Sequence, residues 1–115
     1  MSNRCNFCKI VAGESPSCKV YSDDRVTAFH DIHPVAPIHV LIVPNQHISS
    51  VNDLTEADEP LVGHMFTVAH HLTKQFNLSQ SGYRLIINTG PDSGQAVFHL
   101  HLHLIGGRRM RYPMG

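Results

Sequence analysis

The chain has 115 residues, of which 42% are hydrophobic, and this length suffices for one compact domain over residues 1–115 but not for two of ordinary size. Its nine basic residues balance its nine acidic ones, which argues against a protein that covers a nucleic-acid backbone. No apolar run approaches the roughly twenty residues of a membrane-spanning helix, and the first residues lack the apolar region of a secretory signal. We therefore expect a cytoplasmic protein with no membrane or nucleic-acid partner.

Three short strands are the first elements expected in chain order. Apolar runs at 19–21 and 26–29 flank the turn-rich segment 22–25, a pattern typical of a β-hairpin. A β-branched run at 39–43 lies between Pro37 and Pro44 and predicts a third strand.

A long helix and two more strands follow. Apolar residues recur at helical spacing from Glu59 to Phe76, with Asp58 placed to cap the helix and Pro60 in its first turn. Further strands are expected at 83–88 and 98–105. Because strands and helices do not alternate repeatedly, this order predicts an α+β fold rather than a parallel, doubly wound sheet.

The last predicted strand contains His99, His101 and His103 in strict alternation with apolar residues. Successive side chains of a strand point to opposite faces, so the histidines should share one face. The residues predicted to face the core are Phe98, Leu100, Leu102 and Leu104. Nothing about packing requires imidazole three times at solvent-facing positions, so a chemical role is indicated.

Two kinds of chemistry fit this pattern. One metal ion cannot bind all three histidines, because on a straight strand the outer two lie roughly 13 Å apart while a histidine nitrogen must approach zinc to about 2.1 Å. An adjacent His-x-His pair can still bind a metal, as in a small metal-dependent enzyme. The other interpretation is phosphoryl chemistry, in which neutral imidazole attacks phosphorus while its neighbours donate to the phosphate oxygens.

The cysteines Cys5, Cys8 and Cys18 are too few for a disulfide scaffold, so reduced thiols or a metal site are expected. Cys5 and Cys8 have the spacing of a zinc knuckle, which needs two further ligands. A thioredoxin-like redox site would open a helix inside a βαβ unit, which is not expected at this terminus. Cys18 has no evident partner.

The segment 94–104, GQAVFHLHLHL, resembles the signature of the histidine-triad (HIT) family. Residues 29–32, 36–44 and 88–90 occur in the order and spacing of that family, and residues 106–115 resemble its Hint branch, the purine nucleoside phosphoramidases. The resemblance implies a HIT-like fold, an antiparallel sheet of about five strands with one long helix. It also implies a homodimer, in which Tyr112 matches an aromatic residue near the partner's active site.

The implied activity is hydrolysis of the phosphorus–nitrogen bond of AMP or GMP phosphoramidates through a covalent nucleotidyl-histidine, with no catalytic metal or organic cofactor. His101 matches the nucleophile, His103 a phosphate-binding position and His39 a fourth active-site histidine. The positions that match nucleotide-binding residues are Phe7, Phe29, Asp31, Ile32, Leu41, Asn88, Gln95, Val97 and His103. Ala96 stands where many Hint relatives carry a hydroxyl that contacts the leaving group, which leaves the preferred amine open. A regulatory module that binds nucleotides with little turnover is the alternative.

Part of the family carries the same Cys-x-x-Cys and binds zinc with two histidines, which correspond here to His47 and His99. The resemblance therefore implies a structural zinc site formed by Cys5, Cys8, His47 and His99. Such a site would tie the amino terminus to the histidine strand. From the sequence we expect Cys8→Ser to release zinc and lower the melting temperature while sparing much of the activity.

Overall fold

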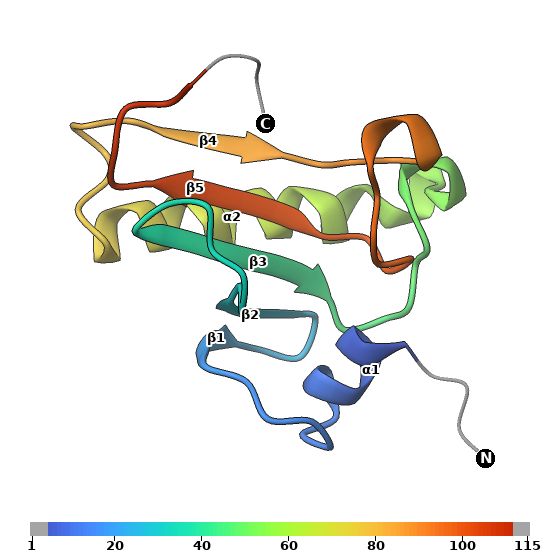
Figure 1. Cartoon of the computed structure of the whole chain (residues 1–115). Helices are drawn as coiled ribbons and strands as arrows, with labels where there is room; N and C mark the ends of the chain where they lie inside the picture. The colour runs from blue at the N-terminus through green and yellow to red at the C-terminus, as the bar shows by residue number, and fades with distance from the viewer. Residues whose placement is uncertain (1–4, 112–115) are drawn as a thin grey trace.

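The computed structural model describes residues 5–111, so the expectation for Tyr112 lies outside the described residues. Its elements in chain order are α1 (Asn6–Val11), β1 (Lys19–Ser22), β2 (Val26–His30), β3 (Ile38–Pro44), η1 (Val51–Asp53), η2 (Glu56–Asp58), α2 (Glu59–Gln75), β4 (Tyr83–Ile86), η3 (Pro91–Ser93) and β5 (Leu102–Gly106). The five strands form one antiparallel sheet in the order β1-β2-β3-β5-β4 (Figure 1). The prediction of a five-stranded antiparallel sheet with one long helix is confirmed.

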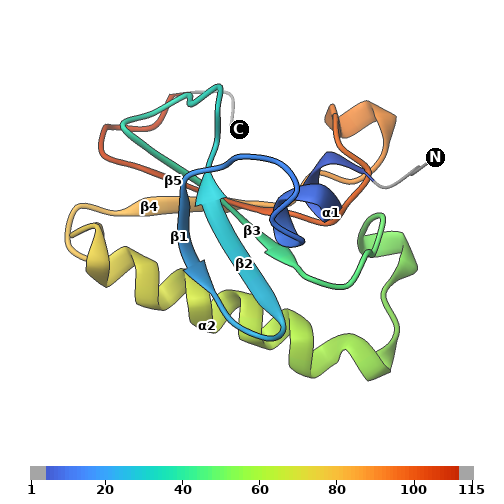
Figure 2. The same ribbon diagram turned by 90° about the horizontal axis from the view of Figure 1, so that it is seen from below.

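The helix α2 covers one face of the sheet (Figure 2). Its buried residues Met65, Val68 and Leu72 pack with inward-facing residues of the central strands. The sheet residues of this cluster are Val26, Ala28, Val40, Ile42, Leu102 and Leu104. Because these positions alternate along each strand, the residues between them are directed to the opposite face.

The opposite face carries a second, smaller core. Phe29, Leu41 and Val43 pack there with Phe7 and Ile10 of α1, and α1 and α2 lie on opposite sides of the sheet (Figure 2). Burial of both faces explains why the sequence of β3 is apolar at nearly every position instead of alternating.

The strand β5 begins later than the alternating pattern predicts. Residues 97–99 form a bend, Phe98 is 61% exposed instead of facing the core, and only His103 of the three histidines lies within the strand. The physical reason is that residues 99 and 100 bond to the end of β3 and to the loop after it, and are not part of the ladder between β3 and β5. The Leu100 N–H donates to Ile48 O at 2.6 Å and the His99 ring bonds to Pro44 O, so this stretch is bound to the loop after β3.

The helix ends also differ from the sequence expectation. Helix α2 starts at Glu59 with Pro60 in its first turn, as predicted, but the Asp58 carboxylate accepts from Thr55 N–H at 2.9 Å and so caps the preceding turn, η2. The short helix α1 was not expected; the Cys5 sulfur caps it by accepting from Cys8 N–H at 3.3 Å.

Strand β4 ends at Ile86, two residues before the end predicted from the sequence. Within residues 5–111 no helix combines the length and the apolar character needed to cross a bilayer.

Candidate active site and metal cluster

His101 lies just before β5 and is 7% exposed. Its Nδ1 is 2.7 Å from the backbone carbonyl of His99, and because a carbonyl only accepts, the proton is on Nδ1. The other ring nitrogen, Nε2, therefore keeps its lone pair in the neutral ring. A nucleophilic imidazole needs this arrangement, and the acceptor that supplies it is backbone.

A chain of hydrogen bonds sets the tautomers of His39 and His103. The Val35 N–H donates to His39 Nδ1 at 3.1 Å, so the proton of neutral His39 is on Nε2. His39 Nε2 lies 2.9 Å from His103 Nδ1, which must then accept. His103 consequently carries its proton on Nε2. This atom is buried and has no hydrogen-bond partner among the residues that the structure describes.

Burial keeps these two rings neutral. It lowers the pKa of His103 to about 4, with further lowering by His101 and His39. Burial also lowers the pKa of His39, although the Asp31 carboxylate, 3.3 Å from His39 Nε2, opposes the shift. At neutral pH the site thus presents an uncharged N–H donor on His103 next to His101, whose ring centroid is 4.9 Å away.

Cross-strand pairing brings further predicted site residues into one row. Phe29 of β2 pairs with Leu41 of β3, and Leu41 pairs with His103 of β5. Paired residues point to the same face, so an apolar floor runs from His103 to Phe29. Phe7 closes this floor, with its ring centroid 5.4 Å from Phe29 and 5.2 Å from His101. Val97 packs against the same cluster.

The loop after β2 carries Asp31 and Ile32. Asp31 Oδ1 accepts from His33 N–H at 2.8 Å, which fixes the carboxylate beside His39. Ile32 is 80% exposed and belongs to neither apolar core.

Gln95 and Asn88 are placed differently from one another. The Gln95 side chain is buried, accepts from Gly90 N–H and donates to Ser49 O and Val97 O. Both protons of its amide are used within the protein, so Gln95 holds the 90–97 loop in place, and its role in nucleotide binding stays a prediction. Asn88 is half-buried and follows Ile86, the cross-strand partner of His103.

Four side chains form a compact cluster beside this site. The ligand atoms of Cys5, Cys8, His47 and His99 are separated pairwise by 3.2 to 3.6 Å. Four atoms at such spacing form a nearly regular tetrahedron whose centre lies about 2.0 to 2.2 Å from each, close to typical Zn–N and Zn–S bond lengths. His99 Nε2 donates to Pro44 O at 2.8 Å, which leaves Nδ1 as a ligand. The donor set therefore fits a tetrahedral metal ion.

Asp31, His39 and His103 also lie close enough together to share a metal ion. In the structure, however, the two rings are hydrogen-bonded to each other at 2.9 Å. A metal there would require Nε2 of His39 to lose its proton.

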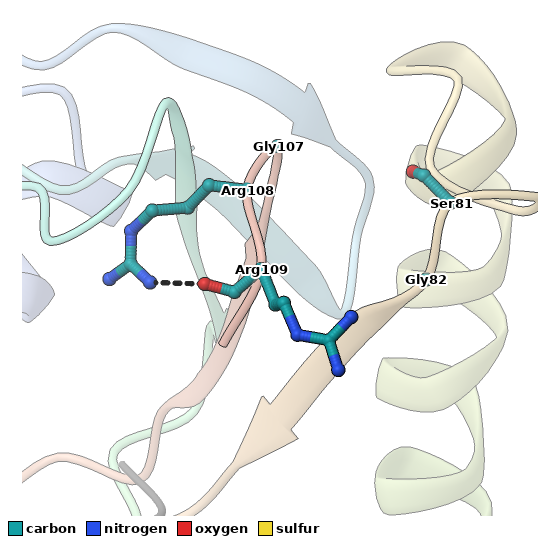
Figure 3. Close-up of a pocket in the computed structure, with 5 residues that line it drawn as sticks. All are labelled: Ser81, Gly82, Gly107, Arg108 and Arg109. Carbon is teal, nitrogen blue, oxygen red and sulfur yellow. Dashed lines mark hydrogen bonds between the residues drawn. The ribbon is translucent and has the colours of Figure 1, made fainter. Parts of the chain in front are cut away.

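A hollow of about 320 Å³ lies after β5 (Figure 3), and no histidine is among the residues that line it. Its lining residues are Ser81, Gly82, Gly107, Arg108 and Arg109. The side chains of Arg108 and Arg109 point in different directions (Figure 3). Arg108 Nη2 donates to Val35 O at 2.6 Å, and the N–H of the same Val35 anchors His39. Arg108 thus helps to hold the loop that orients His39.

Sequence reasoning missed three of these contacts: the His99 carbonyl, the Val35 N–H and the approach of Phe7 to His101. The first two are backbone groups and leave no mark in side-chain identity. The third contact could have been predicted. Phe7 lies between two predicted metal ligands, Cys5 and Cys8, and a third predicted ligand, His99, is two residues from His101.

Comparisons with known proteins agree with this geometry. The profile of the HIT domain matches residues 12–110. The purine nucleoside phosphoramidase of Escherichia coli (strain K12) is 49% identical over 115 residues, covering 100% of this chain and 93% of that protein. The crystal structure of a HIT family hydrolase from Legionella pneumophila Philadelphia 1 superposes with a TM-score of 0.95 at 45% identity, covering 97% and 100% of the two chains. The structure of a histidine triad protein from Clostridium difficile superposes with a TM-score of 0.92 at 44% sequence identity, and the match covers 96% of each chain.

Proposed function

Since this chain belongs to the HIT family, we propose that it is a hydrolase that cleaves the phosphorus–nitrogen bond of purine nucleoside phosphoramidates. The E. coli relative bears the name of that activity and matches the whole of this chain. The observation that carries the proposal is the hydrogen bond from His101 Nδ1 to the His99 carbonyl, which leaves Nε2 free to attack. The match to the HIT profile over residues 12–110 supports a single HIT domain over residues 1–115.

The reaction proceeds in two displacements at the α-phosphorus. In the first, His101 Nε2 bonds to phosphorus, the P–N bond breaks, and the amine leaves after taking up one proton from solvent. The His99 carbonyl stabilises the positive charge that develops on the imidazole ring. In the second, water attacks the nucleotidyl-histidine, releases the nucleoside monophosphate and free His101, and returns a proton.

His103 stabilises charge on the phosphate. The hydrogen bonds from Val35 through His39 fix its proton on Nε2. This N–H is buried and has no acceptor among the described residues, so it can donate to a phosphate oxygen. Negative charge on the phosphoryl oxygens peaks in the transition state, so a donor held in place beforehand is most effective there. We assign Asn88 as the second donor to the phosphate, because it follows Ile86 by two residues and Ile86 pairs with His103.

The nucleoside lies on the apolar floor. We assign the base to the surface formed by Phe7, Phe29, Leu41 and Val97, with exposed Ile32 covering it. Asp31 at the edge of this floor accepts hydrogen bonds from the ribose hydroxyls, since a carboxylate can accept two. Ala96 offers no hydroxyl to the leaving amine.

We assign a structural zinc ion to Cys5, Cys8, His47 and His99, because the four donors already lie at tetrahedral spacing. When bound, this ion supplies cross-linking of the amino terminus to the site and no chemistry. The ligand set requires both cysteines in the reduced state, which favours work in the cytoplasm.

The experiment that tests the activity follows the release of amine from an adenosine phosphoramidate. Wild type should release it, and a rapid acid-free quench followed by mass spectrometry should find the nucleotidyl group on His101. His101→Ala should lose roughly a thousand-fold or more of kcat, because the attacking atom is gone. His70→Ala, an exposed histidine of α2, is the matched control and should retain full activity.

Two other outcomes would replace this proposal. Tight AMP binding with no release of amine would indicate a regulatory module. Turnover that forms no adduct on His101 and depends on added metal would indicate a metal-dependent enzyme, with Asp31, His39 and His103 as its ligands.

A further inference from the structure

The metal cluster and the nucleophile share a structural element. Phe7 lies between Cys5 and Cys8 in the first turn of α1, and its ring packs edge-to-face on His101, with centroids 5.2 Å apart and an interplanar angle of 88°. The same ring contacts Phe29 on the apolar floor at 5.4 Å. The helix that brings both thiolates to the cluster therefore also forms the wall against the His101 imidazole.

His99 makes a second connection. Its ring is held between the cluster, where Nδ1 lies 3.2 Å from Cys5 Sγ, and Pro44 O, 2.8 Å from Nε2. Its backbone carbonyl is the acceptor that fixes the tautomer of His101. Because the ring and the carbonyl belong to one residue, a displacement of the His99 backbone would move both the metal ligand and the acceptor on which the nucleophile depends.

The amino-terminal segment depends on the cluster for its rigidity. Helix α1 has six residues, too few for a helix that is stable in isolation. Phe7 and Ile10, which are 6% exposed each, and the partly buried Val11 pack it against the sheet, and the four ligand atoms add a second attachment. Without a metal the contacts among these four atoms are weak thiol and imidazole hydrogen bonds, whereas a bound ion replaces them with coordinate bonds.

We propose that metal binding at Cys5, Cys8, His47 and His99 is thermodynamically coupled to nucleotide binding at His101, with Phe7 as the positioning residue that transmits the coupling. This inference rests on the proposed function and adds a dependence of that site on metal supply. It also revises the expectation that Cys8→Ser spares the activity. Coupling between two sites is reciprocal, so AMP must tighten zinc binding by the same factor by which zinc tightens AMP binding.

The test compares zinc-loaded and chelator-stripped wild-type protein. Calorimetry should show AMP binding weakened about ten-fold on removal of zinc, and a competing zinc indicator should show the same factor for zinc with and without AMP. Independently of any nucleotide, the NMR signals of the His101 imidazole should shift and broaden in the stripped protein. Folded, stripped protein with unchanged AMP affinity and unchanged His101 signals would overturn the proposal.

Variants separate coupling from general loss of structure. Cys8→Ser should reproduce the stripped state, while Cys18→Ser, which removes an exposed cysteine outside the cluster, should match wild type. Phe7→Leu should still bind one zinc ion, but the ratio of AMP affinities with and without zinc should fall to within about three-fold of unity. If the ratio of AMP affinities with and without zinc in Phe7→Leu equals that of wild type, Phe7 does not transmit the coupling.

The outcomes remain distinguishable if a single variant fails. Should Cys8→Ser not fold, stripped wild type and Phe7→Leu carry the comparison. Should zinc-loaded wild type bind no AMP, the proposed function is wrong, and the response of the His101 signals to zinc still decides whether the cluster positions the nucleophile.

Discussion

His103 shows how neighbouring groups set the tautomer of a single residue. The Val35 N–H occupies Nδ1 of His39, His39 then donates to His103, and the proton of His103 is directed outward on Nε2. Burial lowers the pKa of His103 to about 4 and keeps the ring neutral. A neutral donor avoids a fixed positive charge that would hold the product phosphate.

This lowered pKa predicts a loss of stability in acid. The unfolded chain binds a proton at His103 near pH 6.5, whereas the folded protein does so only near pH 4, so stability is complete above about pH 6.5 and declines as the pH falls toward 4. We expect His103 to contribute on the order of 2 to 3 kcal/mol to this decline. Urea denaturation at pH 7.5 and pH 4.5 measures the free energy of unfolding at each pH. In His103→Gln, whose side chain cannot titrate, this free energy should fall less between the two pH values, by that amount. Equal declines would contradict the assignment.

At the scale of elements, the last residue of β5 has no room for a side chain. A Cβ on Gly106 would lie 2.8 Å from Leu78 Cδ1 and 2.9 Å from Cδ2, and Leu78 is only 2% exposed, so it cannot move aside freely. Gly63 on the outer side of α2 is the opposite case, with nothing within 4 Å of its Cβ position.

The same substitution should therefore have opposite effects at the two glycines. Gly106→Ala should destabilise the fold by about 1 to 3 kcal/mol through overpacking. Gly63→Ala should stabilise it by about 0.5 to 1 kcal/mol, because alanine restricts the unfolded chain and favours helix. Equilibrium unfolding in urea measures both. A neutral Gly106→Ala would mean that Leu78 repacks at no cost.

At the scale of the whole molecule, the sheet has an open edge at β4. Among residues 5–111 this strand pairs with β5 alone, and its first residue, Tyr83, is 40% exposed. Natural proteins protect such edges, and two-fold symmetric dimers, in which the same surface of each copy meets, are the commonest oligomers. We propose that β4 of two copies pairs in a homodimer.

Light scattering at micromolar concentration should then report twice the mass of the chain. Tyr83→Lys places a charge at the proposed seam and should shift the protein to monomer, because edge lysines oppose strand pairing. Lys19, at the start of the other edge strand β1, provides the control: Lys19→Gln should stay dimeric. A monomeric wild type would exclude the proposed pairing.

The sequence by itself determined the α+β order, the bounds of α2 to within one residue and the identities of the histidines and cysteines, because periodicity and short motifs are local properties. It did not reveal that the alternation ends at the bend before Leu102, since the partners that bind there, Pro44 and Ile48, are over fifty residues distant. Only the tertiary structure decided which way each triad ring points. His99 turns its ring to the cysteines and its carbonyl to His101, because the direction of a side chain at a bend depends on the groups that close over it.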